Sequence, residues 1–447
     1  MVRVVITGIG VICPAGGSTE EFWNNCLSGS AAVTAIPEEW ALYSTFSSTI
    51  WAPLPPIDFL KSRLSRIELM QNDTTALLAV AASDQALAMS GTVAKMVNEK
   101  KNTYALEAID PLRAGVFMGT GIGGIASFAA NEGHQLYAPV SAALRSNPGG
   151  DTASFDAIHR LLRYPPRFHP FAVAMSMPNT SSATLGIKYS LNGPNLTVCN
   201  ACCAGATAIG YALKAIRNSE IDWALAGGVE YLRDGYGGIF KGFDIAKTLV
   251  NPGADPASAN RPFDTARSGF LFAEGGAAVL VLESLDHAQK RNAQPLAEIL
   301  SYAESFDAHS IMSPDPSGTQ SERTVRKALD EAGMTPENID YINAHGTATP
   351  ANDEIEARLI ERVFPHGPLV NATKSLTGHA IGASGAIETA VTALSLCTQT
   401  VHGCKNLINP VRPLRFVQKS GAYPIQTALT QSFAFGGHSA ALILSRC

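Results

Sequence analysis

Cys202, His345 and His379 are far apart in the sequence, but together they supply the side chains that nucleophilic catalysis requires. A cysteine thiolate is a strong nucleophile, and a histidine can accept or donate a proton near neutral pH. Cys202 follows the extended-type residues 196–198 and precedes a stretch composed almost entirely of Ala, Gly and Thr. This pattern predicts a central, buried helix with Cys202 at its N-terminus, where the helix dipole should lower the pKa of the thiol below about 8.5.

The two histidines lie in glycine-containing turns, His345 in the segment NAHGTATP after a predicted strand and His379 in the segment TKSLTGHAIG. One histidine in such a turn is more often structural than catalytic. Two of them favour catalysis here, because an internal duplication of the chain should bring both loop ends near Cys202. Lys374 is surrounded by apolar residues and glycines, and a buried lysine needs a carboxylate partner. The candidate partners are Asp353, Glu356 and Glu388.

Two glycine-rich stretches could bind substrate or cofactor atoms through backbone N–H groups. Residues 119–124, GTGIGG, follow a predicted strand and match the GxGxxG pattern of dinucleotide-binding loops. The pattern is not at the start of the chain and no acidic strand end follows at the expected distance, so a dehydrogenase is the weaker interpretation. Residues 431–438, QSFAFGGH, precede the last predicted strand and form either a tight turn or an oxyanion hole.

The spacing of the eight cysteines along the chain matches neither a disulfide scaffold nor a metal site. Cys199 and Cys203, which flank Cys202, could suggest a metal site, but a structural zinc site would need a second ligand pair at a similar spacing, and none follows. We therefore expect no metal, no cofactor and a reducing, cytoplasmic compartment.

The composition indicates a compact globular protein, because 46% of the 447 residues are hydrophobic and 16% are charged. The net charge of −5 gives no electrostatic case for binding nucleic acid. The first eight residues resemble a strand and a glycine turn rather than a signal peptide. We also expect no membrane insertion, because no apolar run approaches the length of a membrane span.

Apolar strands alternate with helical segments, which is typical of the α/β class. Strands are predicted at 3–8, 114–118 and 223–228, and one long helix at 64–90. The region 126–170 contains Pro and Gly turn signals. We interpret it as a surface excursion or part of a subunit interface.

The second half of the chain repeats the first in outline. Residues 341–347 parallel residues 116–121, and residues 372–396 again place a loop before a small-residue helix. Each half alone would leave its small-residue helix exposed, so the halves should form one body around a pseudo-dyad. The predicted division gives an N-terminal half, 1–256, and a C-terminal half, 257–447.

Taken in this order, the motifs resemble the β-ketoacyl-[acyl-carrier-protein] synthases of the chain-elongating type, which are condensing enzymes of the thiolase superfamily. The similarity spans nearly the whole chain and also includes VVITGIG at 4–10, NRPFD at 260–264 and FGG at 435–437. The resemblance implies a five-layer αβαβα thiolase-like fold built from two duplicated halves. It further implies a dimer, usually of identical chains, and a reaction that needs neither metal nor nucleotide.

The resemblance also implies a role for each site residue. Cys202 would take an acyl group from an acyl carrier protein, and the backbone N–H groups of Cys202 and Phe435 would form the oxyanion hole. His345 and His379 would stabilise the enolate formed when a malonyl-carrier protein loses CO₂. The supporting residues would be Lys374, paired with Glu388, together with Asp353 and Glu356. The acyl pocket and its gate would be formed by Ile122, Phe270 and Phe435.

The sequence departs from the family pattern at several positions. Asn200 stands where Thr usually precedes the Ala-Cys pair, Cys203 follows the nucleophile, and His438-Ser439 replaces a commoner Thr-Asn. The stretch 124–171 is longer than usual. Met70 and Gln71 stand at two positions that are often basic for carrier-protein docking, although Lys61, Arg63 and Arg66 are nearby. These differences leave the acyl specificity and the pathway open, between fatty-acid elongation and a specialised polyketide or polyene system.

The leading interpretation is an acyltransferase that extends an acyl chain by two carbons through decarboxylative condensation. A non-catalytic, pocket-shaping subunit of a heterodimer is the alternative, but such subunits typically lack the cysteine that this chain has at position 202. A thiolase acting on coenzyme A esters would have a second cysteine in the C-terminal glycine loop, where this chain has FGGH. Acyl- and malonyl-loaded carrier proteins are therefore the expected partners, with a homodimer or a heterodimer as the assembly.

Overall fold

The computed structural model describes residues 2–57, 60, 64–131, 156, 169–253 and 255–447. Most of the irregular region 126–170, and the basic residues Lys61 and Arg63, lie outside the described residues.

Ten strands form one sheet that consists of two five-stranded units. The first unit has the order β1-β9-β8-β6-β7, with β1 (Val4–Ile12), β6 (Ala114–Gly119), β7 (Asn195–Val198), β8 (Trp223–Tyr231) and β9 (Gly275–Ser284). The second unit has the order β10-β16-β15-β11-β12, with β10 (Ala297–Phe306), β11 (Tyr341–Asn343), β12 (Leu369–Asn371), β15 (Thr427–Phe433) and β16 (His438–Ser445).

The two units repeat one pairing pattern. Strand β6 is parallel to β7 and β8, and β11 is likewise parallel to β12 and β15, whereas the remaining pairs in each unit are antiparallel. The units meet where Val5 and Ile6 of β1 pair with Glu298 and Ala297 of β10. This repetition supports the duplication that the sequence predicts. Strand β9 of the first unit comes after residue 256, and the division at that residue stays a prediction.

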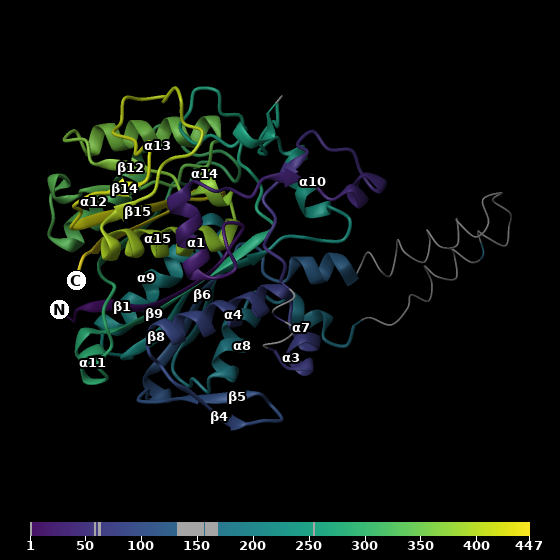
Figure 1. The fold of residues 1–447 in the computed structure, drawn as a ribbon, viewed down its shortest axis with the longest axis vertical. Helices are drawn as coiled ribbons and strands as arrows, with labels where there is room; N and C mark the ends of the chain where they lie inside the picture. Colours follow the sequence, from purple (N-terminus) through teal and green to yellow (C-terminus); the bar gives the residue numbers. More distant parts are fainter. Residues whose placement is uncertain (1, 58–59, 61–63, 132–155, 157–168, 254) are drawn as a thin grey trace.

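Helices complete five layers around these strands (Figure 1). Helices α4 (Thr74–Met89) and α8 (Thr180–Lys188) cover the outer face of the first unit. Helices α12 (Thr319–Ala332) and α13 (Pro350–Val363) cover the second unit. The middle layer is formed by α9 (Ala204–Arg217) and α15 (Ser384–Thr398), which contact strands of both units.

The small residues of α9 and α15 allow the two helices to pack backbone to backbone. A Cβ atom on Gly205 would lie 2.8 Å from the Ala386 nitrogen, and one on Gly385 would lie 2.9 Å from the Ala206 Cβ. Every residue of α15 from Ser384 to Leu396 is buried. The predicted central helices are therefore present, and their composition follows from this close approach.

Two predictions about helices are wrong. The first is that no apolar run approaches the length of a membrane span: residues 381–398 are long and apolar enough, with a mean hydropathy of 1.2. Because 89% of this segment is buried as the middle layer of the protein, the absence of membrane insertion stays a prediction. The helix predicted at 64–90 is divided into α3 (Arg66–Gln71) and α4. The division occurs because Asn72 is extended and the Asp73 side chain caps α4 by accepting the Thr75 N–H at 2.7 Å.

Candidate active site

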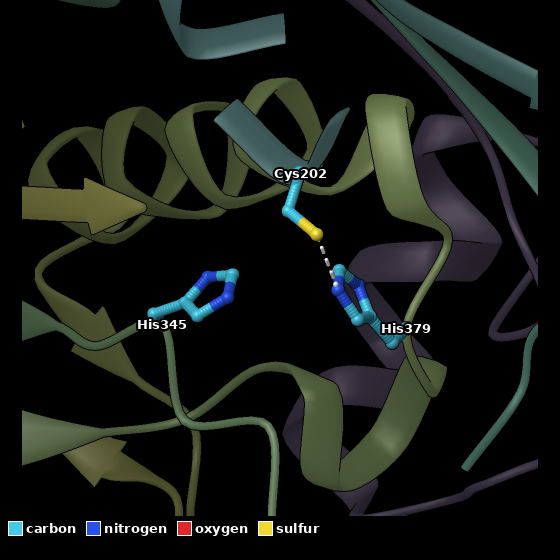
Figure 2. Close-up of side chains that lie close together, drawn as sticks. All are labelled: Cys202, His345 and His379. Carbon is cyan, nitrogen blue, oxygen red and sulfur yellow. Dashed lines mark hydrogen bonds between the residues drawn. The ribbon is translucent and has the colours of Figure 1, made fainter. Parts of the chain in front are cut away.

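Three loop ends bring the predicted catalytic side chains together (Figure 2). Cys202 lies in the short turn η3 (Ala201–Cys203) between β7 and α9, and His345 lies in the loop after β11. His379 follows α14 (Lys374–Thr377) and precedes α15. Each of the three side chains is only 2% exposed, and the Cys202 Sγ lies 3.0 Å from the His379 Nε2.

Left-handed backbone conformations accompany each loop. Ala201 has a φ of 51°, Ala348 a φ of 66° and Ile381 a φ of 44°, a region that residues other than Gly rarely adopt. Such conformations cost on the order of 1 kcal/mol each and tend to occur at functional sites. The surrounding packing therefore imposes the shape of the loops that carry Cys202, His345 and His379.

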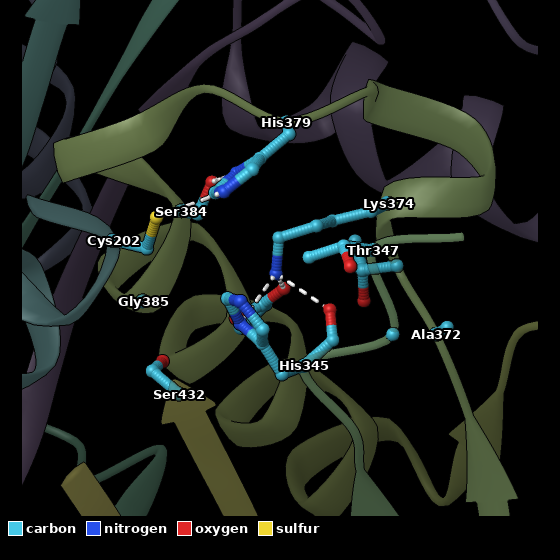
Figure 3. A network of polar contacts seen from close by, with 12 residues as sticks. Cys202, His345, Thr347, Ala372, Lys374, His379, Ser384, Gly385 and Ser432 are labelled. Atoms are coloured by element: carbon cyan, nitrogen blue, oxygen red, sulfur yellow. Dashed lines mark hydrogen bonds and ion pairs between the residues drawn. The ribbon is translucent and has the colours of Figure 1, made fainter. Parts of the chain in front are cut away.

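Lys374 is buried beside His345 (Figure 3). It forms an ion pair with Glu388. Its Nζ also lies 3.1 Å from the His345 Nδ1 and donates to the His345 carbonyl at 2.7 Å. An ammonium group has only donors, so the His345 Nδ1 must accept. The proton of the neutral His345 ring is therefore on Nε2, where it is available to a substrate oxygen.

The other two candidate carboxylates bind backbone rather than Lys374. Glu356 accepts the N–H groups of His345 at 2.7 Å and Gly346 at 2.8 Å. Asp353 accepts the N–H groups of Thr347 and Ala348, both at 3.1 Å. Both carboxylates are buried, and together they fix the loop that carries His345.

The pKa of the Cys202 thiol contradicts the prediction from the helix dipole. Burial raises this pKa to about 12, although the Lys374 ammonium and the backbone N–H groups of Phe435 and Cys202 lower it. Complete burial outweighs the favourable position before α9. Burial and the nearby Lys374 also hold the pKa values of His345 and His379 well below 6.5. Both imidazoles are therefore neutral at pH 7.

The backbone N–H groups of Cys202 and Phe435 both act on the Cys202 sulfur and favour its charged form. The amides on either side of Phe435 have other partners, since Ala434 donates to the His438 carbonyl at 2.9 Å and Gly436 to the Ile311 carbonyl at 2.7 Å. Two backbone donors that converge on the nucleophile can also stabilise an oxyanion formed there.

A cavity of about 280 Å³ opens onto these groups. Cys202, His345, His379, Phe270 and Phe435 all contribute to its wall, as the predictions for the site require. Ile122 is not among the lining residues; it packs against the apolar cluster that includes Cys202 and Phe240. Its predicted place in the acyl pocket therefore stays a prediction.

The GTGIGG loop has a partner within the protein that argues against a dinucleotide. The Glu230 carboxylate accepts the N–H groups of Gly121, Ile122 and Gly382 and the hydroxyl of Thr120. These backbone donors are the ones that a phosphate would use, and a carboxylate already occupies them.

The sulfur and nitrogen donors of Cys202, His345 and His379 lie within 4.8 Å of one another, a spacing that could also hold a metal ion. The Lys374 ammonium next to His345 weakens the binding of a cation at this position by charge repulsion. The absence of a metal from the reaction stays a prediction.

Sequence reasoning missed two residues that organise the site. One is Glu230, which ties the GTGIGG loop to Gly382, and the other is Ser384, whose Oγ lies 2.9 Å from the His379 Nδ1. The residues near the predicted docking position are accessible: Arg66 and Met70 are exposed on α3, and Gln71 is half-buried.

Comparison with known proteins covers the whole chain. The family described as "Beta-ketoacyl synthase, N-terminal domain" matches residues 1–288, and "Beta-ketoacyl synthase, C-terminal domain" matches residues 296–407. The chain is 34% identical to a 3-oxoacyl-[acyl-carrier-protein] synthase 2 of Coxiella burnetii, over 99% of this chain and 98% of that protein. It is 32% identical to the chloroplastic 3-oxoacyl-[acyl-carrier-protein] synthase I of Arabidopsis thaliana, over 99% of this chain and 86% of that protein.

Solved structures agree with this result. A β-ketoacyl synthase from Burkholderia phymatum superposes with a TM-score of 0.80 at 27% identity and covers 100% of both chains. The ishigamide ketosynthase/chain length factor gives a TM-score of 0.80 at 27% identity, over 100% of this chain and 99% of that one. A type II PKS ketosynthase in complex with its acyl-carrier protein gives 0.79 at 25% identity, again over 100% and 99%. The fold is thus the thiolase-like α/β fold of ketosynthases, and the chain belongs to the β-ketoacyl synthase family of acyltransferases.

Proposed function

We propose that this protein extends an acyl chain by two carbons through the decarboxylative condensation of a Cys202-bound acyl group with malonyl-acyl carrier protein. The observation that carries the proposal is one cavity in which the Cys202 sulfur, two neutral histidines and two backbone N–H donors meet. The names of the relatives support the same chemistry. The product is a fatty-acid or polyketide-type chain.

In the first half-reaction, the Cys202 sulfur attacks the carbonyl carbon of an acyl thioester on the carrier protein. The new C–S bond forms to Cys202, the C–S bond to the carrier breaks, and the thiol proton ends on the leaving carrier thiol. The N–H groups of Cys202 and Phe435 stabilise the negative oxygen of the tetrahedral intermediate. Because the Cys202 pKa is about 12 in the free protein, we infer that the thiolate forms only as the thioester is attacked.

In the second half-reaction, the malonyl thioester loses CO₂, and the electron pair of the broken C–C bond remains as an enolate. The Nε2–H groups of His345 and His379 donate to the enolate oxygen. The enolate carbon then attacks the Cys202 thioester, which forms the new C–C bond and releases the Cys202 thiolate. One proton from water restores the thiol.

The test of the nucleophile is the intact mass of the protein after incubation with a panel of acyl-carrier proteins. The wild type and Cys199→Ala should gain one acyl group, because Cys199 does not line the cavity. Cys202→Ala should gain none. An acyl adduct on Cys202→Ala would overturn the assignment, and the acyl groups accepted by the wild type would identify the pathway.

We also propose that the protein works as a dimer through strand β7. The two edges of the sheet differ, because β12 is covered by residues 415–417, which bond to Val370, whereas β7 is an edge strand on which Leu196 is 40% exposed. An open edge strand invites pairing with another chain. Solved relatives named as ketosynthase/chain length factor pairs support a related subunit as the alternative to a second copy.

Sedimentation of the pure chain tests this assembly. The wild type should sediment as a dimer, Leu196→Lys should sediment as a monomer, and Ile408→Lys, which also places a charge on an exposed apolar residue, should remain dimeric. A monomeric wild type that gains activity only with a related subunit would establish the heterodimer instead. We infer a cytoplasmic location as well, which the eight free cysteines support.

A further inference from the structure

The second ring nitrogen of His379 has a partner that the proposed reaction does not yet use. The Ser384 Oγ lies 2.9 Å from the His379 Nδ1 and also accepts the Ala380 N–H at 3.1 Å (Figure 3). Ser384 is the first residue of α15 and is 3% exposed. The ring of Phe270 packs edge-on against His379, with ring centroids 5.2 Å apart, and restrains the imidazole plane. The His379–Ser384 contact is therefore part of a closely packed arrangement.

The hydrogen bonds that Ser384 can make favour one direction for this contact. The hydroxyl has one proton, and the Ala380 N–H already points at its oxygen. If the His379 Nδ1 carried a proton, it would also donate to the Ser384 oxygen, and the buried hydroxyl proton would lose the ring nitrogen as its acceptor. An unpaired buried donor of this strength is costly, because the hydrogen bond that it made to water in the unfolded chain is not replaced.

The opposite arrangement leaves only a weak donor without an acceptor. If Ser384 donates to the His379 Nδ1, the ring proton is on Nε2 and points at the Cys202 sulfur 3.0 Å away. The group that then loses an acceptor is the Cys202 S–H, and a thiol is a much weaker donor than a hydroxyl. The balance of hydrogen bonds therefore favours a proton on Nε2.

We propose that Ser384 is a positioning residue whose hydroxyl donates to the His379 Nδ1 and thereby keeps the ring proton on Nε2, facing Cys202 and the cavity. This proposal rests on the proposed condensation for its catalytic meaning. In that reaction His379 must donate from Nε2 to the enolate oxygen, just as Lys374 forces His345 to donate from its own Nε2. Two different side chains thus set the same tautomer on the two histidines.

The tautomer can be measured without any reaction, by ¹⁵N NMR of the full chain labelled at its ten histidines. The His379 signals are assigned by their loss in His379→Asn. We expect an unprotonated Nδ1 and a protonated Nε2 at neutral pH. A protonated Nδ1 in the wild type would overturn the proposal, whether or not the protein proves to be a condensing enzyme.

Two serine variants in α15 separate positioning from packing. Ser384→Ala should give a mixture of His379 tautomers and lower the rate of malonyl-carrier decarboxylation roughly 3- to 10-fold, as expected for the loss of one hydrogen bond. Acylation of Cys202 should change less, because the oxyanion hole is untouched. Ser395→Ala removes another buried serine hydroxyl from the same helix and should change neither measurement.

The outcomes are distinct. An unchanged His379 tautomer in Ser384→Ala would overturn the proposal even if that variant were less active. Suppose that neither the wild type nor any variant condenses a substrate, but His379 of the wild type carries its ring proton on Nε2. The proposed function would then fail, and the assignment of Ser384 would stand.

Discussion

At the scale of single residues, the site depends on one buried cation. Lys374 joins Glu388 to both the ring and the carbonyl of His345. Removing one member of a buried ion pair leaves the other charge without compensation, which costs more than the pair itself contributes. Lys374 therefore has two separable roles, one in stability and one in setting the His345 tautomer.

Lys374→Met should lower the free energy of unfolding by about 3–5 kcal/mol, because it leaves the Glu388 carboxylate buried alone. The double variant Lys374→Met/Glu388→Gln should recover most of that stability but none of the decarboxylation. Urea unfolding and malonyl-carrier decarboxylation are the measurements. A single variant as stable as the wild type would contradict the first role, and an active double variant would contradict the second.

A chelator should leave the condensation rate unchanged, whereas Zn²⁺ should inhibit it. The sulfur and nitrogen donors of Cys202, His345 and His379 are close enough to bind zinc, which would occupy all three at once. Adding the chelator after zinc should restore activity. Loss of activity with the chelator alone would show that the reaction needs a metal.

The residue types and motifs were sufficient to predict that Cys202, His345, His379 and Lys374 share one site. They could not predict the Cys202 pKa, because the position before a helix is visible in the sequence but the completeness of burial is not. The residue types alone left three carboxylates open as the Lys374 partner, because that choice depends on how α13 and α15 lie relative to each other. The family resemblance implied Glu388, and the ion pair confirms this pairing.

At the scale of elements, the contact between α9 and α15 sets the distance between Cys202 and His379. The backbones touch at Gly205 and Gly385, and each helix begins directly after one of the catalytic loops. The Ala, Gly and Thr composition of both stretches made this layer predictable. The break between α3 and α4 is not predicted, although Asp73 is a common N-cap residue, because the segments on either side of it, 66–71 and 76–82, are rich in helix-forming residues.

Gly205→Ala should destabilise the protein by about 1–3 kcal/mol, because the added Cβ would lie 2.8 Å from the Ala386 backbone. It should also slow acyl transfer by moving Cys202 relative to His379. Gly242→Ala in α10 (Gly238–Ile245) is the matched control, since its Cβ would meet nothing within 4 Å. That change should be neutral or slightly stabilising. Equal effects of the two changes on the urea midpoint would contradict the packing argument.

At the scale of the whole molecule, Glu230 ties the first sheet unit to the middle layer. Its carboxylate binds the loop after β6 in the first unit and the Gly382 N–H at the start of the second small-residue helix. Burial raises the pKa of Glu230 to about 7 from an ordinary 4.5, although the backbone donors lower it. The sequence shows only a glutamate at the end of a strand, because its partners come from loops far apart in the chain.

This raised pKa predicts how stability depends on pH. Between about pH 4.5 and 7 the folded protein holds a proton on Glu230 that the unfolded chain has lost, so the free energy of unfolding falls as the pH rises. The Glu230 contribution is present below pH 4.5 and lost above pH 7, and it amounts to at most about 3 kcal/mol.

Urea midpoints of the wild type and Glu230→Gln at pH 5 and pH 8 measure this contribution. The wild type should lose more stability between these values than the variant, which has no titrating group at position 230. Glu356 and Glu388, whose pKa values are also raised to about 7, titrate in both proteins and cancel in the comparison. An identical pH slope in the two proteins would contradict the prediction.

The unequal edges of the sheet limit how large an assembly of this protein can become. One border is already covered by the chain's own residues 415–417, so among the described strands of this sheet β7 is the edge at which we propose that it is lengthened. When two copies, or one copy and a related subunit of the same shape, meet there, the combined sheet has a covered border at both ends. Association then stops at two subunits, because the ten described strands leave no free edge from which edge-to-edge growth into a filament could continue.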